Sequence, residues 1–163
     1  LGSKKVIFLP DDYLAKYVAS QTDVEIISWK GICIVHDQFN ENEINNIRKN
    51  NPGIKIIAHP ECPPEVIKAS DFAGSTSGMI NYVKNNQPKK VMMVTECSMS
   101  DNIQVENPNV EFIKPCNLCP HMKKITLPKI LECLENETGE IVMDQETINK
   151  ARLSVEKMVA IGR

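Results

Sequence analysis

The chain has 163 residues, a formal net charge of −2 at pH 7 and a hydrophobic fraction of 42%, so it can bury a core and form one or two small domains. The near-neutral charge excludes the strongly basic surface that binds nucleic acid or an anionic membrane, and neither partner is expected. No apolar run approaches the ~20 residues of a membrane span and no signal-peptide pattern is present, so the expected location is cytoplasmic.

Short β-branched runs alternate with amphipathic segments along the chain. Strands are predicted at Lys5–Leu9, Val24–Trp29, Ile54–Ala58, Val91–Thr95, Val110–Ile113 and Ile141–Met143. Helices are predicted after Asp11 or Asp12, after Asn40, after Pro63 or Pro64, after the turn at residues 74–78, from Leu127 to Leu134 after Thr126, and from Gln145 to Ile161. Strands that alternate with helices indicate βαβ units and a parallel sheet. The predicted fold class is therefore α/β.

Polar side chains follow four of the predicted strands. These are Cys33 with His36, His59 with Glu61, Thr95 with Glu96, and Cys116 with Cys119. Parallel α/β sheets place their ligand groups at the carboxyl ends of the strands. The topology therefore predicts that these four tips converge on one crevice.

The most informative stretch begins where the apolar run ends at Ala58. His59-Pro60-Glu61 follows it, with a proline that fixes the turn between two side chains suited to acid–base chemistry. The later turn at residues 74–78 carries Ser75 and Thr76, and hydroxyls at a helix N-terminus suit an anion. The alternative interpretation is a strand-end histidine beside a solvated glutamate, followed by an ordinary helix cap.

Six cysteines are many for a chain of this length, and in a reducing compartment they indicate metal or redox chemistry more often than disulfides. Cys116 and Cys119 form a Cys-x-x-Cys pair, and no second pair completes a zinc site at zinc-finger spacing. Cys33 and Cys119 could share a metal. A disulfide between Cys116 and Cys119 would act as a redox switch, and the alternative is that Cys116 is a bystander. Simple burial is the expectation for the remaining three, Cys62, Cys97 and Cys133.

Five motifs carry a resemblance to a known family. They are FLPDDYLAKYVA, the tip from Trp29 to His36 with the pattern W-x-G-x-C-x-V-H, IIAHPEC, DFAGSTSGMI and CPHM. In this order they resemble the quinolinate synthases, over nearly the whole stretch from Lys4 to Met122. The resemblance implies condensation of iminoaspartate with dihydroxyacetone phosphate to quinolinate, in NAD biosynthesis. It also implies repeated three-layer αβα units with parallel sheets around a pseudo-threefold axis, and a partner enzyme that supplies iminoaspartate.

The resemblance further implies a [4Fe–4S] cluster held by three cysteines, one from each αβα layer. Residue by residue, it makes Cys33 of the G-x-C-x-V-H tip one ligand and Cys119 before Pro-x-Met another. Three thiolates leave one iron with an open position, so such a cluster acts as a Lewis acid.

The same resemblance implies a substrate site around the cluster. His59 and Glu61 of the His-Pro-Glu triplet correspond to catalytic and substrate-binding residues, and Thr76 of the Gly-Ser-Thr turn to a substrate-binding one. Ser75 and His36 are expected to be their neighbours in that site. The Ser/Thr turn would suit the carboxylates of iminoaspartate or the phosphate.

One layer of the family has no counterpart in this sequence. Residues 1–33 are expected to be the remainder of an αβα layer, residues 34–119 a complete layer, and residues 120–163 a mainly helical segment that packs against the absent first layer. The third cluster cysteine would belong to that layer, with Cys62, Cys97 and Cys116 as weaker substitutes. This stretch alone is therefore expected to be inactive.

Two other function classes compete with the enzyme. One is a non-catalytic α/β fragment that binds a small carboxylated or phosphorylated ligand, with Cys33 and Cys119 merely buried. The other is an electron-transfer iron–sulfur protein, against which the lack of a ferredoxin-like cysteine set counts.

Overall fold

A computed structural model describes residues 2–115 and 117–161. Cys116, half of the predicted redox pair, lies outside the described residues. The described chain divides into two compact units, one formed by Ser3–Pro120 and one that begins at His121. Each is considered by itself below.

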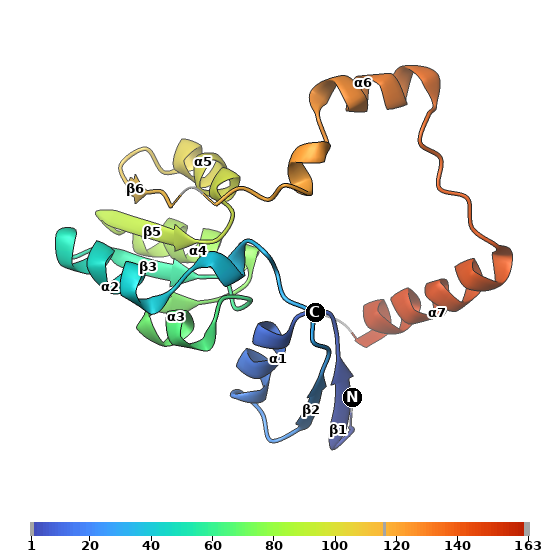
Figure 1. Cartoon of the computed structure of the whole chain (residues 1–163), viewed down its shortest axis with the longest axis horizontal. Helices are drawn as coiled ribbons and strands as arrows, with labels where there is room; N and C mark the ends of the chain where they lie inside the picture. Colours follow the sequence, from blue (N-terminus) through green and yellow to red (C-terminus); the bar gives the residue numbers. More distant parts are fainter. Residues whose placement is uncertain (1, 116, 162–163) are drawn as a thin grey trace. The chain divides into compact units, whose positions relative to one another are not determined.

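The first unit is built on a parallel four-stranded sheet with the order β4-β3-β5-β6. Its strands are β3 (Lys55–Ala58), β4 (Phe72–Ala73), β5 (Lys90–Val94) and β6 (Glu111–Ile113). Every neighbouring pair is parallel, and Ile57 of β3 lies beside Met93 of β5. The predicted α/β fold class with parallel sheets is confirmed (Figure 1).

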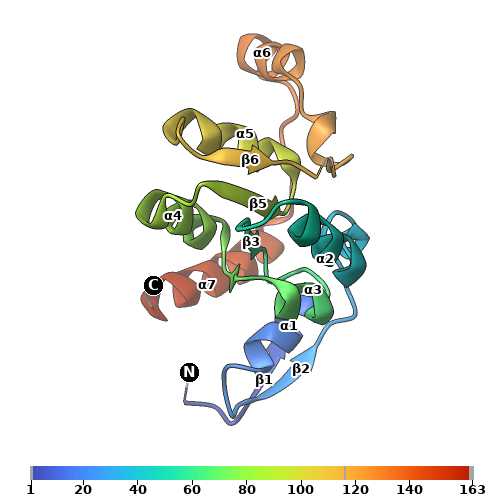
Figure 2. The same ribbon diagram turned by 90° about the vertical axis from the view of Figure 1, so that its left-hand side faces the viewer.

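Helices cover both faces of this sheet. They are α2 (Glu41–Asn50) and α3 (Pro64–Ala69) on one face, and α4 (Thr76–Asn86) and α5 (Cys97–Glu106) on the other (Figure 2). Side chains alternate along a strand, so Ile56 packs with the α2 and α3 side while Ile57 packs with the α4 side. Both isoleucines are fully buried, which explains why β3 reads as a continuous apolar run rather than an alternating one.

The helix starts follow the expected capping chemistry. The Asn40 side chain accepts a hydrogen bond from the Glu43 backbone N–H at 3.0 Å, and Ser75 accepts one from Gly78 at 3.2 Å. Helix α5 was not expected from the sequence, because its serine, aspartate and asparagine residues have low helix propensity. Its N-terminus is capped by the Glu96 carboxylate, which accepts from the Ser98 N–H at 2.8 Å.

A smaller parallel sheet precedes the large one in the same unit. It consists of β1 (Lys5–Phe8) and β2 (Glu25–Ser28), joined by α1 (Asp12–Ala19). The Asp12 N–H donates to the Gly31 carbonyl at 2.8 Å, so the start of α1 lies directly against the loop after β2. A Cβ at Gly31 would lie 2.4 Å from the Pro10 carbonyl oxygen, and only glycine permits this approach.

The second unit is helical, with a 3₁₀ turn at Met122–Lys124, α6 (Leu127–Asn136) and α7 (Gln145–Ile161). The predicted cap at Thr126 and the predicted extent of α7 are confirmed. The predicted strand Ile141–Met143 is wrong, since residues 137–144 form no strand. The predicted burial of Cys133 is also wrong, because the residue is exposed. Its thiol donates a hydrogen bond to the Thr138 carbonyl at 2.9 Å. No helix among the described residues has the length and apolar character needed to cross a bilayer.

Candidate functional site

The connections from β3 and β5 run to opposite sides of the large sheet. β3 leads to β4 on one side, whereas β5 leads to β6 on the other, so a topological switch point lies between them. Open α/β sheets bind ligands in the crevice outside the carboxyl ends of their strands at such a point. His59 follows β3 and Thr95 follows β5, and the His59 N–H donates to the Val94 carbonyl at 3.1 Å.

His36 ties three segments together at this crevice. Its Nδ1 lies 3.0 Å from Oε2 of Glu61, and its Nε2 lies 3.0 Å from Oγ1 of Thr95. His36 is 7% exposed and Thr95 is 5% exposed. Two polar partners in a buried setting therefore fix the plane of the imidazole.

His59 stacks on His36, with ring centroids 4.6 Å apart and planes inclined by 9°. The Glu61 N–H donates to Nδ1 of His59 at 3.4 Å, so in the neutral ring the proton is on Nε2. Burial lowers the pKa of His59, and the adjacent His36 lowers it further. The His59 imidazole is consequently neutral at pH 7.

Glu61 is the acceptor at the centre of the group. The hydrogen bond from His36 lowers the pKa of Glu61, although partial burial of the carboxyl opposes this effect. Glu61 is therefore a carboxylate at neutral pH. Because a carboxylate only accepts, Nδ1 of His36 carries the proton of their shared hydrogen bond.

Cys33 lies at the edge of the same group. Its backbone N–H donates to Oδ2 of Asp11 at 3.0 Å, while Oδ1 of Asp11 accepts from the Leu14 N–H at 2.7 Å and caps α1. Among the described residues, the Cys33 thiol, a His36 ring nitrogen and a Glu61 carboxylate oxygen all lie within 4.8 Å of one another.

Cys33 and Glu61 border a hollow of about 390 Å³. The other residues that line it are Pro10, Asp11, Trp29, Gly31 and Ile32. The hollow therefore opens onto a thiol and a carboxylate, so a small polar ligand placed in it would meet both.

The other predicted site residues lie outside this close group of ligand atoms. Cys119 is half-buried in the segment after β6, and among the described residues it is not one of the three clustered donors. Ser75 caps α4 through its hydroxyl, and Thr76 is the first residue of that helix. Both are exposed.

Two residues matter more than the sequence analysis indicated. Thr95 was expected only as a strand-tip residue, yet its hydroxyl holds the ring of His36. Asp11 was expected only as one of two possible helix caps, yet it also holds the backbone of Cys33. An aspartate directly before a predicted helix is the one available sequence signal, and it did not indicate the second contact.

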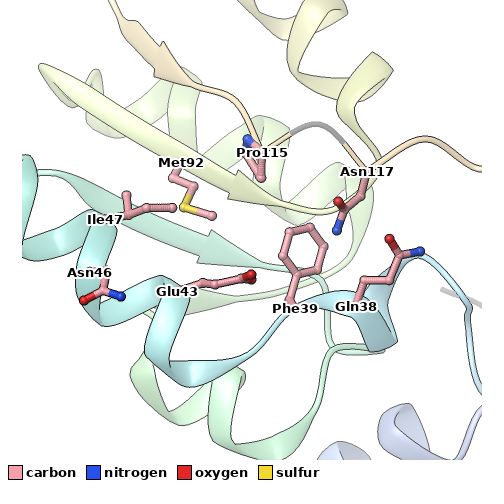
Figure 3. Close-up of a pocket in the computed structure, with 8 residues that line it drawn as sticks. All are labelled: Gln38, Phe39, Glu43, Asn46, Ile47, Met92, Pro115 and Asn117. Carbon is pink, nitrogen blue, oxygen red and sulfur yellow. The ribbon is translucent and has the colours of Figure 1, made fainter.

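A larger hollow of about 590 Å³ lies between α2, β5 and the segment after β6, with the ring of Phe39 facing into it (Figure 3). Its lining residues are Gln38, Phe39, Glu43, Asn46, Ile47, Met92, Pro115 and Asn117. Glu43 is the only ionisable group among them. Of these two hollows, the smaller one is the better candidate, because chemistry needs paired acid–base or ligand groups and it adjoins Cys33 and Glu61.

The fold and the site together define an α/β protein whose polar side chains converge at a switch point between parallel strands. The family described as "Quinolinate synthetase A protein" matches residues 1–160. This chain belongs to that family.

The chain is similar to several proteins named quinolinate synthase. It is 57% identical to one from Sinorhizobium fredii, over 98% of this chain and 44% of the relative. It is 54% identical to one from Xylella fastidiosa, over 99% of this chain and 48% of the relative. "Quinolinate synthase 2" of Mesorhizobium japonicum is 51% identical over 99% of this chain and 50% of the relative. The chain spans about half the length of the curated relatives it matches.

Proposed function

We propose that this chain is part of a quinolinate synthase and carries acid–base and substrate-binding residues of its active site. The observation that carries the proposal is the hydrogen-bonded group of Glu61, His36 and Thr95, with His59 stacked on it and Cys33 at its edge. Four of these side chains belong to the motifs that resemble the family, and the chain's family membership supports the assignment. The reaction is the condensation of iminoaspartate with dihydroxyacetone phosphate, which makes the whole protein a carbon–carbon bond-forming transferase.

One residue of the site, Cys33, has the donor chemistry that an iron–sulfur cluster needs. Cys33 presents a thiol beside a hollow of about 390 Å³, and thiolates are the ligands that iron–sulfur clusters use. Cys33 and Cys119 are the residues of this chain that would hold a [4Fe–4S] cluster. When bound with an open iron position, the cluster would supply Lewis-acid chemistry.

Glu61 and His59 are the proposed acid–base pair. The condensation requires repeated proton transfers while two waters leave, and phosphate is also lost. Glu61 is ionised and held by His36, so it can accept a proton from a substrate carbon or nitrogen. His59 is neutral, and the Glu61 backbone N–H contacts its Nδ1 and not its Nε2. The Nε2–H group can therefore donate a proton to a departing oxygen.

Ser75 and Thr76 are the proposed substrate-binding residues on α4. They are exposed at the N-terminus of a helix of 11 residues, where backbone N–H groups and the helix dipole favour an anion. The carboxylates of iminoaspartate and the phosphate of dihydroxyacetone phosphate are such anions. An enzyme that releases iminoaspartate is the proposed partner, and the reduced thiols that a cluster needs agree with a cytoplasmic location.

Cluster loading of the full-length protein tests the proposal. Cys33→Ser and Cys119→Ser are each expected to remove the iron, the sulfide and the brown colour after anaerobic reconstitution, together with quinolinate formation. Cys133→Ser is the matched control, because Cys133 is exposed and lies in the other unit. Full iron and sulfide content in Cys33→Ser would contradict the proposal.

A further inference from the structure

We propose that Cys33, His36 and Glu61 also form a site for one divalent transition-metal ion, typified by Zn²⁺, when the protein holds no iron–sulfur cluster. This mononuclear site does not depend on the proposed enzymatic function. It follows from the donor atoms themselves and from the groups that surround them.

The three donor atoms lie close to the spacing that a metal ion requires. They lie within 4.8 Å of one another, and His36 Nδ1 is 3.0 Å from Glu61 Oε2. With Zn–S near 2.3 Å and Zn–N or Zn–O near 2.0–2.2 Å, ligand atoms on one tetrahedral ion lie roughly 3.5 Å apart. Small side-chain rotations are therefore enough to place all three on one ion.

Thr95 provides the supporting hydrogen bond that such a site needs. In the metal-free protein Nδ1 of His36 donates to Glu61, and Nε2 accepts from the Thr95 hydroxyl. An ion bound at Nδ1 needs the lone pair of that nitrogen, so the ring adopts its other tautomer. The proton is then on Nε2, which donates it in a hydrogen bond to Oγ1 of Thr95. A hydroxyl can serve in either direction, and a metal-bound histidine normally donates its other N–H in this way.

Charge and donor type select the class of ion. On binding, the Cys33 thiol loses its proton to solvent, and its thiolate together with the Glu61 carboxylate balances a 2+ charge. A set of one thiolate, one imidazole and one carboxylate favours Zn²⁺ and Co²⁺ over Mg²⁺ and Ca²⁺, which prefer oxygen alone. The adjoining hollow of about 390 Å³ leaves the fourth position open to water or a small ligand.

This site and the proposed cluster use the same thiol. If Cys33 is a cluster ligand, as proposed above, an ion bound by all three residues must leave before the cluster can be completed. Zinc would then compete with iron for the unloaded protein, and this consequence alone rests on the proposed function.

Cobalt(II) titration of the full-length protein, stripped of iron and kept reduced and anaerobic, tests the site directly. One Co²⁺ per chain is expected to bind with a thiolate-to-cobalt charge-transfer band. Cys33→Ser should abolish the band, whereas Cys133→Ser should retain it. Thr95→Val should weaken affinity roughly 10- to 100-fold, as loss of a supporting partner does in other metal sites, and Thr95→Ser should restore it.

The results separate the two proposals. Absence of the band in the wild type, or a band that persists in Cys33→Ser, would overturn the mononuclear site. X-ray absorption of the wild type with Zn²⁺ should give one sulfur ligand, and two or more would also overturn it, even if a variant fails to fold. If the band behaves as expected but Cys33→Ser still assembles a full cluster, the mononuclear site stands and the cluster assignment fails.

Discussion

Asp71 connects strand β3 to helix α2 through hydrogen bonds, and replacing it is expected to lower the free energy of unfolding. Its Oδ2 accepts hydrogen bonds from the Ile56 backbone N–H and from Arg48 Nη1, both at 2.9 Å. Asp71→Ala leaves the N–H of fully buried Ile56 without this partner, which costs about 1–3 kcal/mol. The half-exposed ion pair with Arg48 adds at most ~1 kcal/mol. The expected loss of unfolding free energy is thus about 1–4 kcal/mol at pH 7.

The effect of Asp71→Ala should depend on pH with a definite sign. Burial alone would raise the pKa of Asp71, but the hydrogen bonds from Ile56 and Arg48 outweigh burial and lower it below 3.8. A carboxyl group with a lowered folded-state pKa contributes stability that is complete above the unfolded pKa. This stability is lost as pH falls through the folded value. The difference between wild type and Asp71→Ala should therefore shrink below about pH 4.

Urea denaturation of the full-length protein, followed by far-ultraviolet circular dichroism from pH 3 to pH 7, measures both effects. Asp71→Asn keeps an acceptor for the Ile56 N–H without the charge, so it should lose less stability. Asp101→Ala is the matched control, because it removes an exposed ion pair with Lys114 and should cost under ~1 kcal/mol. An Asp71→Ala effect below ~0.5 kcal/mol, or one that grows on acidification, would refute the reasoning.

Substitutions at three further residues of the full-length protein test the site. Glu61→Gln should retain the iron content while turnover falls by roughly 10²–10⁴, and near-normal quinolinate formation would refute its acid–base role. Gly31→Ala places a Cβ 2.4 Å from the Pro10 carbonyl, so it should reduce both thermal stability and iron loading, and unchanged values for both would count against it. Thr95→Val removes the hydroxyl that orients the buried ring of His36, so turnover should fall. Each ~1.4 kcal/mol of transition-state stabilisation lost in this way lowers the rate roughly tenfold. Thr95→Ser should restore turnover, and wild-type turnover in the valine variant would contradict the coupling.

Much of the fold could be predicted because the local signals agreed with it. Buried strands such as β3 are β-branched and apolar throughout, and the caps Asn40, Ser75 and Thr126 are residues whose side chains accept backbone N–H groups. Helix α5 escaped prediction because its helix-forming tendency is weak and its start depends on a glutamate, which is a less usual cap. The two-residue strand β4 is too short for any pattern to reveal.

The sequence pointed to several residues of the candidate site, but not to the contacts between them, and it gave Asp11 only as a helix cap. Motifs pointed to Cys33, His36, His59 and Glu61, and the structure brings these four near one crevice. The hydrogen bond between the Thr95 hydroxyl and His36 spans 59 residues of sequence, and no local spacing encodes such a pair. Burial of Cys133 was predicted wrongly because flanking leucines show that a helix face is apolar, not that it is covered.

The two hydrogen bonds accepted by the Asp11 carboxylate link the formation of helix α1 to the position of Cys33. One carboxylate oxygen begins the helix through Leu14, and the other holds the backbone of Cys33. When α1 unravels, Asp11 is released and the loop that presents the thiol loses its anchor. Without α1, the proposed metal ligand Cys33 would therefore have no fixed direction. The metal binding proposed for Cys33 would then require this helix to be formed.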